Sequence, residues 1–229
     1  MKAWGKRLIL LLPAIMLMGG LAVAADKLVT EAEKRSYAIG ANVAKNIKLQ
    51  SISVDPALVT QGFQDELAGK SLLTDVELGR VMQQIQGEVR QKMMAQHAVD
   101  AAENKKRGEA FLAENSKKEG VKILPGGVQY QVLKKGAGKT PTETDTVLCH
   151  YRGMLVDGKV FDASKPDSPA AFKVSQVIPG WREALKNMPV GSKWQLVIPA
   201  EQAYGERGAG NAIGPNETLV FEVELVGVQ

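Results

Sequence analysis

The sequence has few of the residues on which catalytic and metal centres most often depend. Its 229 residues include one cysteine and two histidines, and they contain no G-x-S-x-G, H-E-x-x-H, C-x-x-C or phosphate-loop motif. These absences argue against a hydrolase triad, a zinc site and a nucleotide-phosphate site. We therefore expect neither a metal ion nor a cofactor.

The single cysteine, Cys149, has no partner for an internal disulfide, so stability must come from packing or association. It lies in TVLCHY, two residues before Tyr151. On a strand these two side chains would face one side while His150 faces the other. The sequence indicates a buried, inert thiol rather than a reactive one.

The chain also lacks an excess of positive charge. The formal net charge is +4, but Lys2, Lys6 and Arg7 lie at the very start, and without them 26 basic residues face 25 acidic ones. No basic stripe is interleaved with aromatic residues. This balance argues against nucleic acid as a partner.

Long apolar runs are absent after residue 25, but one lies before it. Leu8–Leu21 is almost wholly apolar, follows a basic start and precedes Ala22-Val23-Ala24, a small-x-small cleavage pattern. Residues 1–24 are therefore predicted to be a signal peptide, which directs the protein to the periplasm and leaves association with the outer membrane open. The alternative is an uncleaved anchor, since Leu8–Ala25 is uncharged and close to the roughly 20 residues that span a bilayer. Pro13 disfavours that alternative.

Aromatic residues and prolines are scarce in the first half of the mature chain. Residues 26–120 hold three aromatic residues and one proline, whereas residues 121–229 hold eight aromatic residues and eight prolines. Such a shift in composition predicts two domains.

The first half carries the start signals of three helices. Thr30–Glu33 and Thr74–Glu77 are capping boxes, and Asp55-Pro56 supplies an N-cap and a first-turn proline for a helix ending near Gly69. Two small helices make a thin core, and marginal small domains often gain stability by association. We therefore predict that residues 25–74 are a helical dimerisation domain and that the protein is a homodimer.

A single long helix is predicted to follow. No proline interrupts Asp75–Asn115, and a continuous helix there would be about 60 Å long at roughly 1.5 Å per residue. Residues 75–120 are thus a connecting helix, and their polar second part resembles a helix that bridges domains through solvent. The alternative is a compact helical domain folded back on the second half, with breaks at Gly87 and Gly108.

The second half alternates apolar and polar residues over segments typical of β-strands. These segments are 127–133, 145–155, 159–164, 172–175, 193–199 and 218–228. Asp157-Gly158 between two apolar runs predicts a hairpin, and Trp181–Met188 predicts one short helix. Residues 121–229 are therefore expected to form an antiparallel sheet wrapped on that helix, and the whole chain belongs to the α+β class.

The short helix begins in VIPGWREAL. Trp181, Leu185 and Met188 fall at i, i+4 and i+7 on one apolar stripe, so the indole faces inward. Such a ring either fills the core or forms the floor of a cavity walled by other side chains. The spacing alone leaves both interpretations open, and it favours plain core because large apolar pockets are few per protein.

Four separated motifs resemble those of FKBP-type peptidyl-prolyl isomerases. They are HYRGMLVDGKVFDAS, VSQVIPGWREAL, IPAEQAYGERGAG and IGPNETLVFEVEL, and the resemblance covers 127–229. The helical half, with YAIGANVAKNI and GEAFLAEN, is similar to the dimerisation arm of macrophage infectivity potentiator proteins. The resemblance implies a half-barrel sheet around the short helix, with an apolar pocket between them.

The resemblance also implies the residues of the pocket. Catalytic roles fall on Tyr151, Phe161, Asp162 and Tyr204, and substrate-binding roles on Phe172, Val177, Ile178, Trp181, Ile213 and Phe221. Trp181 would be the pocket floor. The Ile178 backbone N–H and the Tyr204 hydroxyl would donate to carbonyls of the bound peptide, while Asp162 would lie near the twisting carbonyl or interact with Tyr151. Ala209 stands where many relatives have a histidine, a departure that bears on substrate and inhibitor preference.

The function implied by the resemblance is an exported peptidyl-prolyl cis-trans isomerase that acts on proline-containing polypeptides and assists folding. Ligands of the FK506 and rapamycin type are implied partners. One alternative is a dimeric periplasmic chaperone that holds unfolded chains, with isomerisation secondary. Another is a pocket that binds ligand without turnover, and Asp162 has its own alternative, a strand-end carboxylate that caps backbone groups.

Overall fold

The computed structural model describes residues 27–229, and the chain divides into two compact units between Leu72 and Leu73. The predicted signal peptide, residues 1–24, lies outside the described residues. None of the described helices is both long and apolar enough to span a membrane.

The first unit contains the helices α1 (Glu31–Leu49) and α2 (Pro56–Leu67). Their starts are those that the sequence predicts. The side chains of Thr30 and Glu33 each accept a hydrogen bond from the other's backbone N–H, and Asp55 accepts one from the first turn of α2. Local signals therefore fix both helices, yet neither helix has a buried residue among those described.

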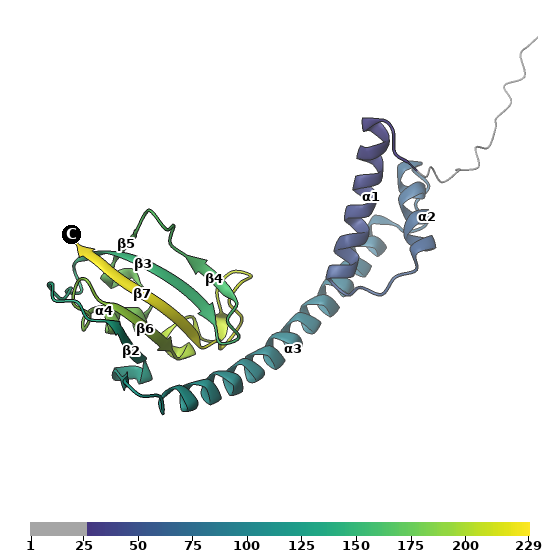
Figure 1. Ribbon diagram of the computed structural model, residues 1–229. Coiled ribbons are helices and arrows are strands. Elements are labelled where there is room, and N and C mark those ends of the chain that lie inside the picture. Colours follow the sequence, from purple (N-terminus) through teal and green to yellow (C-terminus); the bar gives the residue numbers. More distant parts are fainter. Residues whose placement is uncertain (1–26) are drawn as a thin grey trace, which may run out of the picture. The chain divides into compact units, whose positions relative to one another are not determined.

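The second unit begins with the long helix α3 (Asp75–Asn115). It is continuous over the predicted range and capped by the Thr74–Glu77 box. The expected alternative with breaks at Gly87 and Gly108 is wrong, because both glycines lie within α3, which is one continuous helix (Figure 1).

The interpretation of the polar part of α3 as a solvated bridge is also wrong for its last three turns. Asn104, Gly108 and Asn115 are buried. Asn104 donates to the backbone of Pro215 and Asn115 to the side chain of Gln129. Polar side chains can be buried where each finds a hydrogen-bond partner, so a polar helix face does not by itself indicate solvent.

The strands of the second unit form one antiparallel sheet (Figure 1). Within the described chain they are β1 (Val121–Ile123), β2 (Gln129–Lys134), β3 (Thr146–Leu155), β4 (Val160–Ala163), β5 (Ala170–Lys173), β6 (Lys193–Ile198) and β7 (Leu219–Val228). Their order is β1-β2-β6-β7-β3-β4, and β5 pairs with β3. The short helix α4 (Pro179–Leu185) lies between β5 and β6 in the chain. The predicted α+β architecture is confirmed.

Two details of the sheet differ from the sequence-based expectations, and one agrees with them. The predicted strand 172–175 is instead Ala170–Lys173, and it ends at Lys173 because Val174–Gln176 form a 3-10 helix. Strand β1 was not predicted, because three residues are too few to show alternation. The hairpin at Asp157-Gly158 is confirmed, with Gly158 at φ 87° in a turn that closes β3 onto β4.

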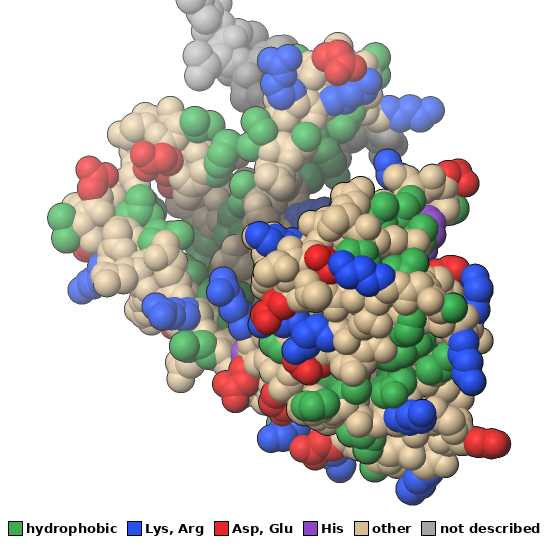
Figure 2. Space-filling view, turned by 90° about the vertical axis from the view of Figure 1, so that its left-hand side faces the viewer, with side chains coloured by type: hydrophobic (Ala, Val, Ile, Leu, Met, Phe, Trp, Pro, Cys, Tyr) green, Lys and Arg blue, Asp and Glu red, His purple; other side chains and the backbone are tan. Residues whose placement is uncertain are grey.

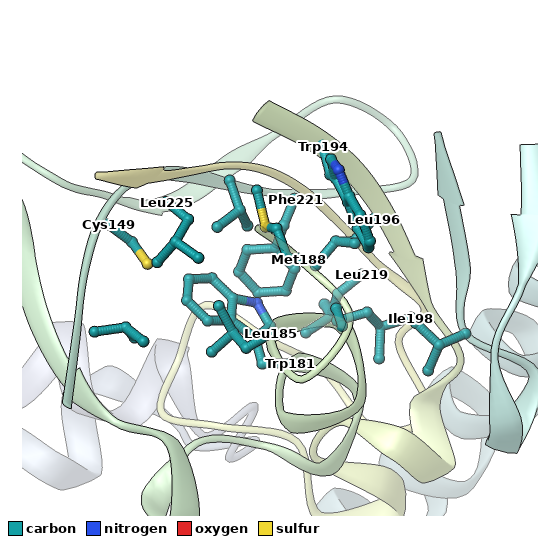
Figure 3. Close-up of a cluster of buried hydrophobic side chains, with 14 of the residues drawn as sticks. Cys149, Trp181, Leu185, Met188, Trp194, Leu196, Ile198, Leu219, Phe221 and Leu225 are labelled. Atoms are coloured by element: carbon teal, nitrogen blue, oxygen red, sulfur yellow. The ribbon is translucent and has the colours of Figure 1, made fainter. Parts of the chain in front are cut away.

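The core lies between the sheet and α4. Trp181, Leu185 and Met188 are at most 4% exposed, and Figure 3 shows them among side chains from β6 and β7. Cys149 is fully buried in the same cluster, and burial raises the pKa of its thiol to about 12. The predicted burial of this thiol is therefore confirmed, and its lack of reactivity stays a prediction. Basic and acidic side chains are interspersed on the face of the domain seen in Figure 2.

Candidate functional site

A hollow of about 270 Å³ opens beside α4. Nine of the ten site residues expected from the sequence line it, together with Gln176. The nine are Tyr151, Phe161, Asp162, Phe172, Val177, Ile178, Trp181, Tyr204 and Phe221. They come from β3, β4, β5, β7, α4, the residues directly before α4 and the loop after β6, so the fold brings together side chains spread over 71 positions of the sequence.

Strand pairing positions the phenylalanines at one side of the hollow. Gly153 on β3 pairs with Asp162 on β4 and with Phe221 on β7. A Cβ at this glycine would lie 2.6 Å from the Phe161 ring and 2.7 Å from the Phe221 ring. Gly153 is therefore required for the close approach of the two rings, whose centroids lie 5.5 Å apart at 87°.

Trp181 lies at the centre of the aromatic group. Its ring makes edge contacts with Tyr151, Phe172 and Phe221, with centroid distances of 5.6, 5.4 and 5.3 Å. Edge-to-face pairs of this kind are the preferred aromatic geometry and add to the stabilisation from burial. The rings thus hold one another in fixed orientations around the hollow.

The two interpretations of the Trp181 indole turn out to be compatible. The side chain is 4% exposed and belongs to the core cluster, and it also lines the hollow. Figure 3 shows it beside Phe221 with Leu185 and Met188 nearby. One face of the residue therefore supports the core while the remainder closes the hollow.

The polar wall of the hollow is built around Asp162. The Tyr151 hydroxyl donates to Asp162 Oδ2 at 2.7 Å, and the backbone N–H of Ala163 donates to Oδ1 at 2.9 Å. The contact with Tyr151 that the resemblance implies is present, and so is the backbone contact of the structural alternative. Burial, with a smaller contribution from the bond to Asp162, raises the pKa of Tyr151 to about 12, so this phenol stays protonated and holds the carboxylate in place.

Tyr204 carries the second hydroxyl of the hollow. It follows the 3-10 helix Ala200–Gln202 and is 41% exposed. Burial, followed by the negative charge of Asp162, raises the pKa of Tyr204. The hydroxyl therefore remains a hydrogen-bond donor at neutral pH.

Two expected features of the neighbouring loop can now be placed. Ile213 is 8% exposed and belongs to the core cluster, and it is not among the residues that line the hollow; its contact with substrate stays a prediction. Ala209 and Ile213 exchange backbone hydrogen bonds of 2.9 and 3.1 Å. The alanine is partly buried against the core, so this part of the loop presents an apolar side chain.

Gln176 is the lining residue that the sequence reasoning missed. It lies directly before Val177 in the same motif. Because its side chain is polar, it does not belong to the apolar pattern that indicated the other lining residues. Within residues 27–229, no group of three or more His, Cys, Asp or Glu side chains is placed to hold a metal ion. The site is thus an apolar hollow with a few oriented polar groups, the composition typical of small-molecule sites.

Comparisons with known proteins agree with this geometry. Residues 137–226 match the profile described as FKBP-type peptidyl-prolyl cis-trans isomerase, and residues 32–132 match the domain amino terminal to it. The outer membrane protein MIP of Legionella longbeachae is 45% identical over 210 residues, covering 91% of this chain and 90% of that protein. The peptidyl-prolyl cis-trans isomerase Mip of Coxiella burnetii is 41% identical, covering 98% and 99%.

A solved structure extends the similarity to three dimensions. The crystal structure of FkpA from Escherichia coli has a TM-score of 0.70 and 38% identity, covering 89% of this chain and 99% of that one. Its similarity spans the helical half as well as the sheet domain. The chain therefore belongs to the FKBP-type peptidyl-prolyl cis-trans isomerases.

Proposed function

We propose that the hollow beside α4 binds a prolyl residue of a polypeptide and promotes rotation about the preceding amide bond. The observation that carries this proposal is the set of edge-packed rings around a hollow of about 270 Å³ with one carboxylate and one donor hydroxyl at its wall. An apolar floor with a few polar groups at the wall suits the prolyl ring.

The chemistry requires no nucleophile. Amide resonance imposes a barrier of about 18–20 kcal/mol on rotation. In the twisted transition state that resonance is lost, so the carbonyl oxygen carries less negative charge than in the planar amide. An apolar hollow then binds the twisted form more tightly, and each 1.36 kcal/mol of such preference gives about a tenfold faster rotation.

The polar groups orient the substrate. The Tyr204 hydroxyl and the Ile178 backbone N–H are proposed donors to peptide carbonyls on either side of the prolyl bond. The Asp162 carboxylate, fixed by Tyr151, lies at the wall where the carbonyl turns. Macrolides of the FK506 and rapamycin type are proposed competitors for the same hollow.

A proline-limited refolding assay tests the site. Asp162→Ala and Tyr204→Phe should each lower kcat/KM about three- to tenfold, the loss expected for one hydrogen bond. Tyr130→Phe is the matched control, since Tyr130 stacks on Trp194 and does not line the hollow. If neither test variant differs from this control, the site assignment is wrong. Saturable macrolide binding by a protein without any rate effect would instead indicate binding without turnover.

We also propose that the first unit forms a homodimer. A groove of about 590 Å³ lies between α1 and α2 and is lined mainly by apolar side chains, among them Val43, Ile47 and Phe63. Phe63 is 57% exposed. Since the groove and the exposed apolar stripes lie on the same two helices, a second copy related by twofold symmetry would cover both at once.

Sedimentation at micromolar concentration tests the dimer. Phe63→Glu should give a particle of half the mass, because it places a charge in the groove. Ile123→Glu, at a side chain that is 62% exposed in the second unit, should leave the mass unchanged. A wild-type monomer would overturn the proposal. If that monomer also suppressed aggregation of an unfolded protein and Phe63→Glu abolished the effect, the groove would serve a chaperone.

We also propose that the protein is exported and that residues 1–24 are removed. The apolar run and small-residue pattern of residues 1–24 support it, and one relative is named an outer membrane protein. Protein recovered from the producing bacterium should begin near Ala25 and fractionate with the periplasm or outer membrane. Recovery of the full chain beginning at Met1 would contradict cleavage.

A further inference from the structure

The last turns of α3 hold the segment that leads from the Tyr204 loop into β7. The side-chain amide of Asn104 donates to the backbone carbonyl of Pro215 at 2.8 Å. Asn104 is 8% exposed, and its partner lies 111 residues further along the chain. A helix that was expected to be solvated therefore makes a buried, directional bond to a loop of the isomerase domain.

A second contact fixes the orientation of this amide. Arg107 donates to Asn104 Oδ1 at 2.9 Å and to Glu217 Oε1 at 3.0 Å. Because the amide oxygen accepts from the guanidinium, its nitrogen is directed at Pro215. The Glu217 side chain is 6% exposed, so the guanidinium also compensates a buried carboxylate.

A third contact brings the helix backbone against the same segment. Gly108 faces Thr218, the residue directly before β7, and a Cβ at this position would lie 2.9 Å from the Thr218 Cβ. A side chain here would push the helix away from the segment. The glycine therefore permits the spacing at which Asn104 reaches Pro215.

Asn216 connects these contacts to the hollow. Its side-chain amide donates to the Ala101 carbonyl on α3 at 3.4 Å, and its backbone N–H donates to the Gly205 carbonyl at 2.8 Å. Gly205 directly follows Tyr204, whose side chain lines the hollow. Asn216 is thus hydrogen-bonded both to α3 and to the carbonyl of Gly205, the residue that follows Tyr204.

We propose that Asn104 is a positioning residue of the isomerase site. By holding Pro215, it fixes the neighbouring Asn216 and, through Gly205, the place of the Tyr204 hydroxyl. The inference rests on the proposed role of Tyr204 in the hollow. It makes the end of the long helix a functional part of the isomerase domain rather than a connector.

The chain offers a matched control on the same helix. Asn115 is 4% exposed and donates to Gln129 Oε1 at 2.9 Å. Gln129 begins β2 and does not line the hollow. Truncating either asparagine removes a buried side-chain amide from α3, but truncating Asn104 alone releases the Tyr204 loop.

The experiment compares full-length variants by kcat/KM on a prolyl peptide at a temperature where all are folded. Asn104→Ala should lower kcat/KM about three- to tenfold, while Asn115→Ala stays within about twofold of wild type. Asn104→Asp keeps the size and the acceptor for Arg107 but has no N–H for Pro215, so it should resemble Asn104→Ala. Adding Asn104→Ala to Tyr204→Phe should cause little further loss, since both act through the same hydroxyl.

Amide hydrogen exchange supplies a readout independent of catalysis. The Asn216 amide should exchange at least about tenfold faster in Asn104→Ala and remain near wild type in Asn115→Ala. Equal activities of the two alanine variants, wild-type activity of Asn104→Asp, or fully multiplicative effects with Tyr204→Phe would each overturn the inference. A wild-type protein without isomerase activity would overturn the proposed function itself. An unchanged Tyr204→Phe would overturn the role assigned to that hydroxyl and with it this inference, but not the isomerase function.

Discussion

The two ends of the described chain use apolar residues in different ways. No described residue from Lys27 to Glu103 is buried, although α1 and α2 carry apolar stripes and side chains such as Phe63. From Val128 to Leu225, by contrast, the sheet and α4 enclose a continuous core. The difference shows that a periodic pattern predicts an element and its inward face, but burial needs a second surface. The sheet domain contains that surface, whereas α1 and α2 have no buried residue among those described.

The same contrast appears within α3. Its apolar first part has exposed side chains, such as Val76 at 82%, whereas its polar last part has buried ones. Burial there follows from hydrogen-bond partners on the loop before β7 and on β2. Apolarity is therefore a poor guide to which end of this helix is packed.

The largest expected effect comes from a cavity in the sheet-domain core. Leu185 is 1% exposed on α4, and Leu185→Ala should lower the free energy of unfolding by about 2–5 kcal/mol. Denaturant unfolding followed by tryptophan fluorescence measures this, since Trp181 and Trp194 both lie in the core. Leu49→Ala, at a side chain that is 72% exposed on α1, should leave the same transition within about 0.5 kcal/mol of wild type. A comparable loss from both variants would remove the contrast between the regions.

How far the sequence predicts this molecule depends on the range of each interaction. The caps at Thr30, Asp55 and Thr74 act within three residues, and the structure has all three. The Asn104 bond joins residues 111 apart, and no local pattern signals it. Burial of α3 was therefore missed for a physical reason.

The candidate site shows the same division. Aromatic residues within ordered motifs, such as Phe161 and Trp181, could be assigned by resemblance, and both line the hollow. Gln176 was missed because a polar residue at a rim has no periodic signature. Ile213, whose backbone pairs with that of Ala209, belongs to the core cluster and is not among the lining residues, and the spacing of the sequence does not reveal this loop pairing.

The next largest expected effect is a difference in stability between alanine substitutions at two glycines of α3. Gly108→Ala should destabilise the second unit by about 1–3 kcal/mol, because the new Cβ would meet Thr218. Gly87→Ala meets nothing within 4 Å, and it should stabilise the helix by up to about 1 kcal/mol through helix propensity. Thermal unfolding at equal protein concentration measures both shifts. If the two alanines stabilise equally, the last turns of α3 are not packed against the isomerase domain.

Alkaline pH gives a third effect, confined to the sheet domain. Burial raises the pKa of Cys149 from its ordinary value of 9.0 to about 12. The resulting stability is fully present below pH 9 and is lost as the pH rises towards 12, because the unfolded thiol ionises first. Denaturant unfolding should show a loss of about 1 kcal/mol between pH 8 and pH 10. Cys149→Ala should lose less over this range, and an identical pH dependence would contradict the assignment to this thiol.

The smallest effect tests how far the two ends of α3 are independent. Thr74→Ala removes the N-cap, whose hydroxyl accepts from the Glu77 backbone at 3.3 Å, and should cost about 1 kcal/mol locally. Amides in the first turns of α3 should exchange about fivefold faster, while the tryptophan unfolding transition stays unchanged. Thr74→Ser should restore slow exchange.

Hydrogen bonds from Thr74 hold the pKa of Glu77 below its ordinary value, so the cap should also weaken as the pH falls below about 4.5. A matching loss of stability in the isomerase domain would mean that the cap and the Asn104 contact belong to one cooperative unit, because the continuous helix would then transmit fraying from its exposed end to its buried one.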